Sequence, residues 1–342
     1  MATPPFNAAT VAAVDRTLAL EPRNVRALIL KADHLAALGD DRAAASFYQF
    51  ALQASPPPER TPPELRAELD RARASCARYA QKLEQFLMTH IQAHNSGAGV
   101  SSARFQQSLD ILLGKKNTYF QRPQTFYFAE LPQIQFYDRA ALPWLDRVEA
   151  ATAAIRLELL EVMKDPSRFK PYVEGDPKRP SKDQSGMRDN PDWSAFYLWK
   201  NGEVVTENAA RCPNTLAALA EVPLPQVGNR SPSILFSLLR PGAHIPPHSG
   251  HVNTRVICHL PLLVPPNCAL RVGNDIRTPV EGNAWAFDDT IEHEAWNNSH
   301  ETRVILLFEA WRPELNDVER SLVRAMFEAI DAHTGEKPSW SI

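Results

Sequence analysis

The chain has 342 residues, of which 44% are hydrophobic, and a formal net charge of −3. This length allows two domains or one large one, and the composition excludes both intrinsic disorder and a strong electrostatic attraction to nucleic acid. The four cysteines form no C-x-x-C pair, so we expect a reducing compartment, without a disulfide framework or a structural zinc knuckle.

Neither a secretory leader nor a membrane span is predicted. The first twenty residues lack a basic start followed by a long apolar run. No stretch reaches the roughly 18 continuous apolar residues that a membrane span needs. We therefore expect a soluble, cytoplasmic protein that binds neither nucleic acid nor membranes.

Residues 1–120 are predicted to form a helical domain. Alanine and leucine recur at helical spacing over 8–21 and 25–54, and a Gly-Asp-Asp sequence interrupts the second stretch where a turn is needed. Val25–Pro56 resembles one tetratricopeptide (TPR) repeat. Because about three repeats normally make an independent solenoid, this TPR-like region is either a helical cap or a surface that presents a groove to a peptide or protein partner.

A longer helix is predicted after a proline-rich spacer at 56–63. Glu64–His94 has helical periodicity and is followed by an Asn- and Gly-rich stop at 95–99. Its expected apolar face comprises Leu65, Leu69, Tyr79, Leu83 and Phe86. Residues 100–118 add another short helix.

Helical periodicity fades from about residue 121, where prolines and aromatic residues increase. Short strands are predicted at Thr125–Phe128 and Gln133–Tyr137, one helix at Asp146–Lys164, and a long loop at Lys170–Asp192. A strand follows at 193–200 with a turn at Asn201-Gly202, and then a short helix at Cys212–Ala220.

Residues 233–313 hold six of the ten histidines and the clearest strand patterns. Strands are predicted at Ser233–Leu239, Thr254–Leu260, Ala269–Val272, Asn283–Phe287 and Thr302–Ala310. Alternation places Arg255 and His259 on one face of the second of these strands and Arg303 on one face of the last. If these faces point into the protein, an anionic ligand would supply the partner that a buried charge needs. The pattern alone leaves open whether they point inward or to solvent.

Several spaced motifs in this window resemble the aspartyl/asparaginyl β-hydroxylase family of Fe(II)- and 2-oxoglutarate-dependent dioxygenases. The matching stretches are DWSAFYLWKNGE (192–203), CPNTLAAL (212–219), PGAHIPPHSGHVNTR (241–255), His259, NDIRT (274–278), EGNAWAFDDTIEHEAWN (281–297) and TRVILLFEAWRPEL (302–315). The resemblance implies an α+β multidomain chain. A double-stranded β-helix (a jelly-roll, cupin-like domain) over 121–342, with a C-terminal helix at Asp317–His333, would follow the helical domain of 1–120.

The resemblance assigns the metal site to two histidines. His248 and His293 match the family's Fe(II) ligands, and imidazole suits ferrous iron. Most of the wider superfamily has a carboxylate two residues after the first histidine, whereas this chain has Gly250, as the aspartyl/asparaginyl β-hydroxylases do. Asp288, Asp289 and Glu294 are therefore not expected to bind the metal, and Asp288-Asp289 is expected to fix the loop that carries His293. Two histidines alone make a poor zinc site.

The same resemblance assigns the cosubstrate and substrate contacts. Arg303, ten residues after His293, matches the arginine that pairs with the far carboxylate of 2-oxoglutarate, and Ser237 matches a serine that donates to the same carboxylate. His259 matches a residue near the cosubstrate's other end, and Arg255 matches an arginine near the substrate. A second family arginine is replaced here by Ile257.

The expected activity is hydroxylation of a C–H bond with O2 and 2-oxoglutarate, most simply β-hydroxylation of aspartyl or asparaginyl groups in a peptide or protein. Two alternatives remain open: a hydroxylase of a small molecule or lipid, and a non-catalytic cupin-like binding protein whose helical domain does the work.

Overall fold

The computed structural model describes residues 6–94, 103–174 and 186–334, and the chain divides into two compact units, Met1–Lys116 and Asn117–Ile342. The sequence places the boundary slightly later, after residue 120. Three expected features lie wholly or partly outside the described residues: the stop at 95–99, the start of the helix at 100–118, and the middle of the Lys170–Asp192 loop.

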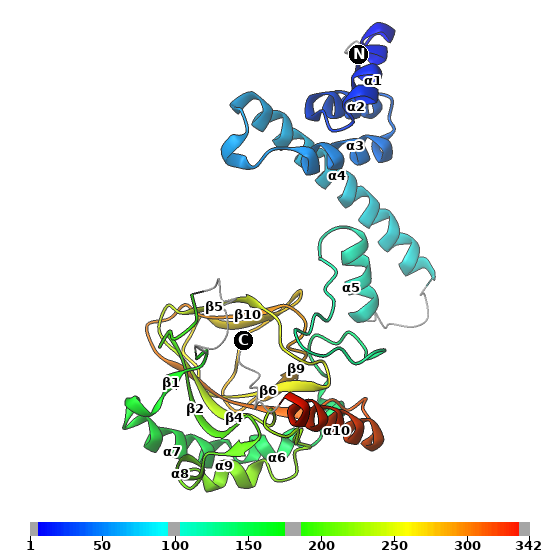
Figure 1. Ribbon diagram of the computed structural model, residues 1–342. Helices are drawn as coiled ribbons and strands as arrows, with labels where there is room; N and C mark the ends of the chain where they lie inside the picture. Colours follow the sequence, from blue (N-terminus) through cyan, green and yellow to red (C-terminus); the bar gives the residue numbers. More distant parts are fainter. Residues whose placement is uncertain (1–5, 95–102, 175–185, 335–342) are drawn as a thin grey trace. The chain divides into compact units, whose positions relative to one another are not determined.

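The first unit consists of helices (Figure 1). They are α1 (Ala8–Leu20), α2 (Val25–Ala37), α3 (Asp41–Ala54), η1 (Pro58–Arg60), α4 (Pro63–His94) and α5 (Ala103–Leu112). Asn7, Asn24 and Asp40 cap α1, α2 and α3, each by accepting the backbone N–H three residues later. Gly39 takes a φ of +82° between α2 and α3, which is why the turn occurs there.

A small core joins α2, α3 and the first part of α4. It contains Leu28, Ala32, Ala44, Tyr48, Ala51, Leu65, Leu69 and Ala72. The predicted apolar face of α4 is right for its first turns but wrong for its far end, because Phe86 is 59% exposed. Beyond Ala72 the described part of α4 contributes nothing fully buried, so helical periodicity overstated how much of it packs.

The second unit contains two antiparallel sheets (Figure 1). The larger has the order β1-β2-β4-β11-β6-β9, with β3 paired to β2, and the smaller has the order β5-β10-β7-β8. The large-sheet strands are β1 (Lys170–Pro171), β2 (Trp193–Lys200), β3 (Glu203–Val204), β4 (Ile234–Leu239), β6 (Arg255–Leu263), β9 (Trp285–Phe287) and β11 (Arg303–Trp311). The small-sheet strands are β5 (His244–His248), β7 (Cys268–Val272), β8 (Asp275–Arg277) and β10 (His293–Asn297).

From β4 to β11 the chain passes back and forth between the two sheets, which is the winding of a cupin-like jelly roll. The expected order of a helical region followed by a cupin-like β domain is confirmed.

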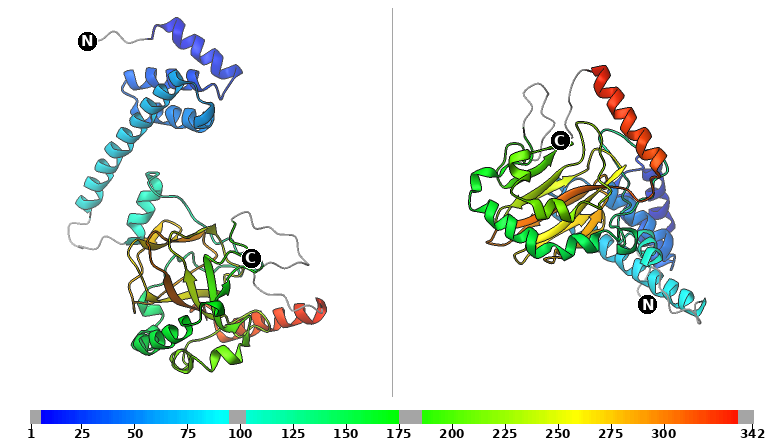
Figure 2. Two further views of the ribbon diagram at one scale, coloured as in Figure 1. Left: turned by 90° about the vertical axis from the view of Figure 1, so that its left-hand side faces the viewer. Right: turned by 90° about the horizontal axis from the view of Figure 1, so that it is seen from below.

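Helices cover the outer side of the large sheet (Figure 2). They are η2 (Arg139–Ala141), α6 (Leu145–Ala150), α7 (Thr152–Met163), η3 (Pro166–Arg168), α8 (Thr206–Ala209) and α9 (Pro213–Ala218), and α10 (Asp317–Thr334) follows β11. Alternate residues of β6 and β11 therefore serve two cores. Val256 and Leu306 pack against the helices, whereas Ile257 and Ile305 face the small sheet.

Some predicted elements differ from the structure. Thr125–Phe128 and Gln133–Tyr137 form only single bridges, Phe126 to Val252 and Phe136 to Phe287, so predicting strands there was wrong. The helix expected at 146–164 is two helices, interrupted where Thr152 Oγ1 donates to the Glu149 carbonyl at 2.6 Å.

The predicted strands between 193 and 310, the turn at Asn201-Gly202 and the helices at 213–218 and 317–334 are confirmed. The sequence missed the strands β1, β3, β5, β8 and β10. No helix in the described residues is long and apolar enough to cross a membrane.

Candidate active site

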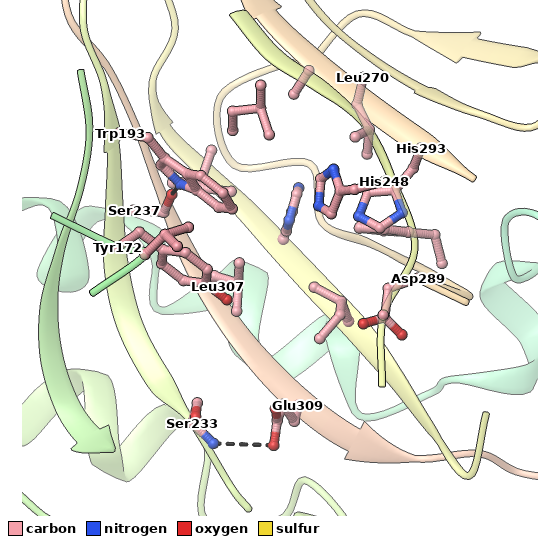
Figure 3. A pocket seen from close by; sticks show the side chains of 18 of the residues that line it. Tyr172, Trp193, Ser233, Ser237, His248, Leu270, Asp289, His293, Leu307 and Glu309 are labelled. Carbon is pink, nitrogen blue, oxygen red and sulfur yellow. Dashed lines mark hydrogen bonds between the residues drawn. The ribbon is translucent and has the colours of Figure 1, made fainter. Parts of the chain in front are cut away.

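A cavity of about 410 Å³ lies between the two sheets of the jelly roll (Figure 3). All six residues singled out from the sequence line it: Ser237, His248, Arg255, His259, His293 and Arg303. The charged faces of β6 and β11 therefore point inward, which the strand pattern alone left open.

His248 and His293 lie side by side on neighbouring strands. They are direct cross-strand partners in the pairing of β5 with β10, and their ring centroids are 4.1 Å apart. Each ring places Nδ1 against the backbone carbonyl two residues earlier, 2.8 Å from Pro246 O and 3.1 Å from Ile291 O. A proton on Nδ1 satisfies both carbonyls and leaves the Nε2 lone pairs available.

The electrostatics of the pair favour neutral imidazoles. Burial lowers the pKa of His248, while burial and the neighbouring His248 ring hold the pKa of His293 well below its usual range. Neutral imidazole is the form that binds a metal ion. Among the described residues no group of three His, Cys, Asp or Glu side chains could hold a metal, so any ion here would have two protein ligands. Two neutral, prearranged imidazoles fit a ferrous ion that keeps open positions.

Gly250 occupies the position where the wider superfamily has its carboxylate. A Cβ built on Gly250 would lie 1.9 Å from Asp289 Oδ2 and 2.3 Å from Asp289 Cγ. The side chain of Asp289 therefore fills the space that a side chain at 250 would need. Glycine is required here by close packing, and the carboxylate in that space comes from the opposite loop.

Asp288 fixes the loop before His293, as predicted. Its Oδ1 accepts from Thr290 N at 3.0 Å and from Thr290 Oγ1 at 2.5 Å, and its Oδ2 accepts from Arg312 at 2.9 Å and from Gln121 at 2.6 Å. Asp288 and Arg312 are both completely buried. The prediction was wrong for Asp289, which makes no such loop contact and lies in the cavity instead.

Arg303 lies buried with its charge uncompensated. It is 3% exposed, its Nε has no hydrogen-bond partner, and no carboxylate of the described residues forms an ion pair with it. Burial lowers the pKa of its guanidinium to about 10. A desolvated cation of this kind needs an anion, and this cavity is where one could bind.

Two further side chains accompany Arg303. Ser237 pairs with Ile305 across β4 and β11, and its Oγ accepts from Trp193 Nε1 at 3.1 Å, which leaves its own proton to donate. Burial and the charge of Arg303 hold the pKa of His259 well below its usual range, so its ring is neutral. The arginine, the hydroxyl and the neutral ring together suit a carboxylate ligand.

Arg255 is not an unoccupied cation. Its Nη1 lies 3.1 Å from Asp289 Oδ2 and its Nε 3.3 Å from Glu309 Oε1, and all three side chains are less than a tenth exposed. Both contacts are ion pairs, because neither nitrogen makes a hydrogen bond within the described residues. The resemblance made Arg255 an arginine near the substrate, a partner for a carboxylate or an amide, but two protein carboxylates already pair with it. Ile257, which replaces the second family arginine, also lines the cavity.

Sequence reasoning left many residues of the cavity without a place in the site, among them Tyr172, Trp193, Asp289 and Glu309. Tyr172 stacks on Trp193 with ring centroids 4.0 Å apart, and Trp193 in turn lies 6.1 Å from the His248 ring. One signal was available for Glu309, because it shares the alternating face of β11 with Arg303. Tyr172 lies in the segment predicted as a loop, and its backbone N–H donates to Trp193 O at 2.9 Å, a pairing with a distant strand that no local pattern predicts.

Residues 149–313 match a family model described as aspartyl/asparaginyl β-hydroxylase. An ornithine lipid ester-linked acyl 2-hydroxylase of Rhizobium tropici is 35% identical over 54% of this chain and 63% of that protein. The aspartyl/asparaginyl β-hydroxylase of Mus musculus is 36% identical over 42% of this chain and 19% of that protein. The chain thus spans less than two thirds of either relative.

A cupin domain from Bordetella pertussis, 18% identical, covers 25% of this chain and 86% of that one with a TM-score of 0.21, a likeness too low to add anything. The segment matched by the family model, residues 149–313, includes strands β4 to β11 and every residue that lines the cavity. On the family model and these relatives, residues 149–313 of this chain are similar to the aspartyl/asparaginyl β-hydroxylase family.

Proposed function

We propose that this chain is a hydroxylase that uses Fe(II), 2-oxoglutarate and O2. The single observation that supports this best is the buried, uncompensated Arg303 in the same cavity as the His248–His293 pair. A pair of histidines alone fits many proteins, but a lone buried guanidinium beside it needs an anion, and the far carboxylate of a dicarboxylate cosubstrate would supply it. Similarity to a hydroxylase family agrees with this reading.

Each polar residue of the cavity has a distinct part in this proposal. The Nε2 atoms of His248 and His293 would hold the iron, because both Nδ1 atoms face backbone carbonyls. Arg303 would pair with the far carboxylate of 2-oxoglutarate, and the Ser237 hydroxyl would donate to the same group while Trp193 fixes its orientation. The bound iron would supply the oxidising chemistry, with oxygen and the cosubstrate as its reactants.

The remaining walls keep water away from the reacting atoms. Leu270 and Ala295 from the small sheet and Ile305 and Leu307 from the large one line the cavity. Phe287 packs edge-on against His293, with ring centroids 5.3 Å apart, and holds that ring in place. A dry, apolar wall strengthens the charged contacts and protects a reactive intermediate from side reactions.

Two substrates are candidates. The first is the β-carbon of an aspartyl or asparaginyl group in a peptide or protein, after the mouse relative. The second is an acyl chain, after the rhizobial lipid hydroxylase, and one observation favours it: Ile257 stands where the family has an arginine, and Arg255 is already paired with Asp289 and Glu309.

We also propose that the α2–α3 hairpin is a TPR-like module that recruits a protein or peptide partner. Its support is the close packing of small residues, Ala32, Ala44 and Ala51, between the helices. Pull-down of partners by the intact chain, compared with a variant altered on the exposed side of α3, would test this.

Succinate formation measured with the purified full chain tests the hydroxylase proposal. Succinate is expected only with iron, 2-oxoglutarate and air, and it should disappear in the variants His293→Ala and Arg303→Met. Glu292→Gln, a change outside the cavity, should keep the activity. Failure of the intact protein to bind Fe(II) or to turn over 2-oxoglutarate, even uncoupled from substrate, would instead support the cupin-like binding protein.

A further inference from the structure

The cavity has two charged ends on one strand. Arg303 and Glu309 share the inward face of β11 and are separated by Ile305 and Leu307. At about 3.4 Å per residue, their Cα atoms lie roughly 20 Å apart. Arg303 is the cosubstrate end in the proposed function. The other end is an acidic cluster, defined here as Asp289 and Glu309 with the Arg255 guanidinium between them.

The acidic cluster carries one cation and two carboxylates. Lys200 and Glu174, which also line the cavity, pair with each other at 2.6 Å and add no net charge. Among the described residues this end of the cavity therefore has a net charge of −1 when all groups are ionised. A substrate carboxylate placed here would meet two like charges and only one, already shared, guanidinium.

The two carboxylates differ in their hydrogen bonds. Glu309 Oε2 accepts from Ser231 Oγ and, at 3.1 Å, from Ser233 N (Figure 3). Asp289 Oδ1 is buried and accepts no hydrogen bond within the described part of the chain. A buried carboxylate oxygen without a donor is costly, so this atom is where a ligand with an N–H donor would be stabilised.

An apolar surface adjoins the acidic cluster. Ile257 pairs with Glu309 across β6 and β11, and Leu307 follows two residues before Glu309 on the same face. Tyr197 of β2 lies in the same large sheet, separated from Leu307 by Leu235 of β4. A family arginine in place of Ile257 would add a cation at this point. Isoleucine instead extends the apolar surface from the cluster toward the metal-binding pair.

We propose that the substrate is a cationic amphiphile: its ammonium group donates to Asp289 in the acidic cluster, and its alkyl or acyl chain lies on Ile257 and Leu307 toward His248 and His293. This deepens the proposed function, on which it rests for the identity of the reacting carbon. It also assigns Arg255 a positioning role, in which the guanidinium holds the two carboxylates together instead of binding a substrate acid.

Binding of three probes with the same chain length tests the proposal: n-octylamine, n-octanol and n-octanoate. They are titrated into the full chain at near-neutral pH, with quenching of tryptophan fluorescence or calorimetry as the readout, because Trp193 lines the cavity. We expect the amine, protonated at this pH, to bind at least about tenfold more tightly than octanoate, with octanol between them.

Matched variants locate the preference. Asp289→Asn and Glu309→Gln each keep the size of the side chain and should reduce the amine-to-octanoate ratio by about tenfold, and Ile257→Arg should reverse it. Glu292→Gln, which changes a carboxylate outside the cavity, should leave the ratio unaltered. Either carboxylate variant serves if the other does not fold, as judged by circular dichroism.

Equal or tighter binding of octanoate by the wild-type chain, or an unchanged ratio in both carboxylate variants, would overturn the proposal. Its failure is separate from failure of the proposed function, because no turnover is needed. If the chain prefers the amine but never forms succinate, the role of the acidic cluster is supported and the hydroxylase proposal is refuted. If the chain forms succinate but prefers octanoate, the hydroxylase proposal is supported and the role of the acidic cluster is refuted.

Discussion

Substitution of Gly250 by alanine tests the close packing between the two loops at the cavity. The added Cβ would lie 1.9 Å from Asp289 Oδ2 and 2.8 Å from Asp289 Oδ1, although ordinary contacts begin at 3.4 Å. The carboxylate of Asp289 must then retreat. It is buried, ion-paired with Arg255 at 3.1 Å, and held by the backbone bond from Gly250 N to Asp289 O at 2.6 Å, so it has little room.

The magnitude follows from these contacts. Overpacking of a buried site costs about 1–3 kcal/mol, and a weakened ion pair adds to this, although Arg255 keeps Glu309 as a partner. We expect Gly250→Ala to lower the free energy of unfolding by about 2–4 kcal/mol. Backbone strain contributes nothing, because Gly250 is not one of the glycines with positive φ.

A double-mutant cycle with Asp289→Ala isolates the contact, since that change removes all three clashing atoms. In the Asp289→Ala background, Gly250→Ala should cost less than about 1 kcal/mol, which gives a coupling of about 1.5–3 kcal/mol. Urea unfolding followed by tryptophan fluorescence is the assay. Every tryptophan lies after residue 116, so the signal reports the second unit alone.

Additive effects of the two changes would refute this account of Gly250. A cost of Gly250→Ala below about 1 kcal/mol in the wild-type background would refute it as well, since the loops would then yield freely. Gly242→Ala provides a comparison, because Gly242 has a φ of +72° and a Cβ added there would meet nothing within 4 Å. That variant should show only the cost of an unfavourable backbone, about 1 kcal/mol, with no coupling to Asp289→Ala.

Three further predictions concern the buried charges. Arg303→Met should abolish 2-oxoglutarate binding measured by calorimetry and yet stabilise the cosubstrate-free protein by about 1–3 kcal/mol in urea, since it removes a desolvated cation without a partner among the described residues. Arg312→Met should instead destabilise the protein by about 3–5 kcal/mol, because it leaves the completely buried Asp288 carboxylate alone; an equal or greater stability would contradict the importance of this pair. Burial raises the pKa of Asp289 to about 6, above its unfolded value of 3.8, so its contribution to stability is present below pH 3.8 and is lost as the pH rises to about 6. The stability of the wild type relative to Asp289→Asn should therefore fall between these pH values, and a constant difference would contradict the raised pKa.

The elements that the sequence predicted correctly are those whose own residues specify them. β6 and β11 alternate between two cores, and α2 and α3 combine periodicity with capping residues and a glycine at their turn. Local pattern sufficed there. β5 and β10 carry the two histidines and were missed, because His244–His248 contains two prolines at the edge of its sheet and β10 is largely polar.

The sequence placed His248, His293 and Arg303 in one site because their motifs are local and strongly patterned, and all three line the same cavity. The acidic cluster was not predictable, because its members come from β6, β11 and the loop before β10, and only the winding of the jelly roll brings them together. The alternation placed Arg255 on one face of its strand without deciding whether that face points inward, and no local pattern showed that two carboxylates would meet it.

The two arginines of the cavity have the same chemistry and opposite surroundings. Arg303 has no carboxylate partner in the described residues, so binding an anion there relieves a desolvation cost that the protein already bears. Arg255 has two, so an anion there would have to displace a buried carboxylate and leave it unpaired. The fold thus places its uncompensated guanidinium at the end of the cavity where we propose that the cosubstrate binds. Substrate recognition is left to the apolar walls and the spare carboxylate oxygen of Asp289, and this difference between the two ends favours an amphiphile over an acidic side chain.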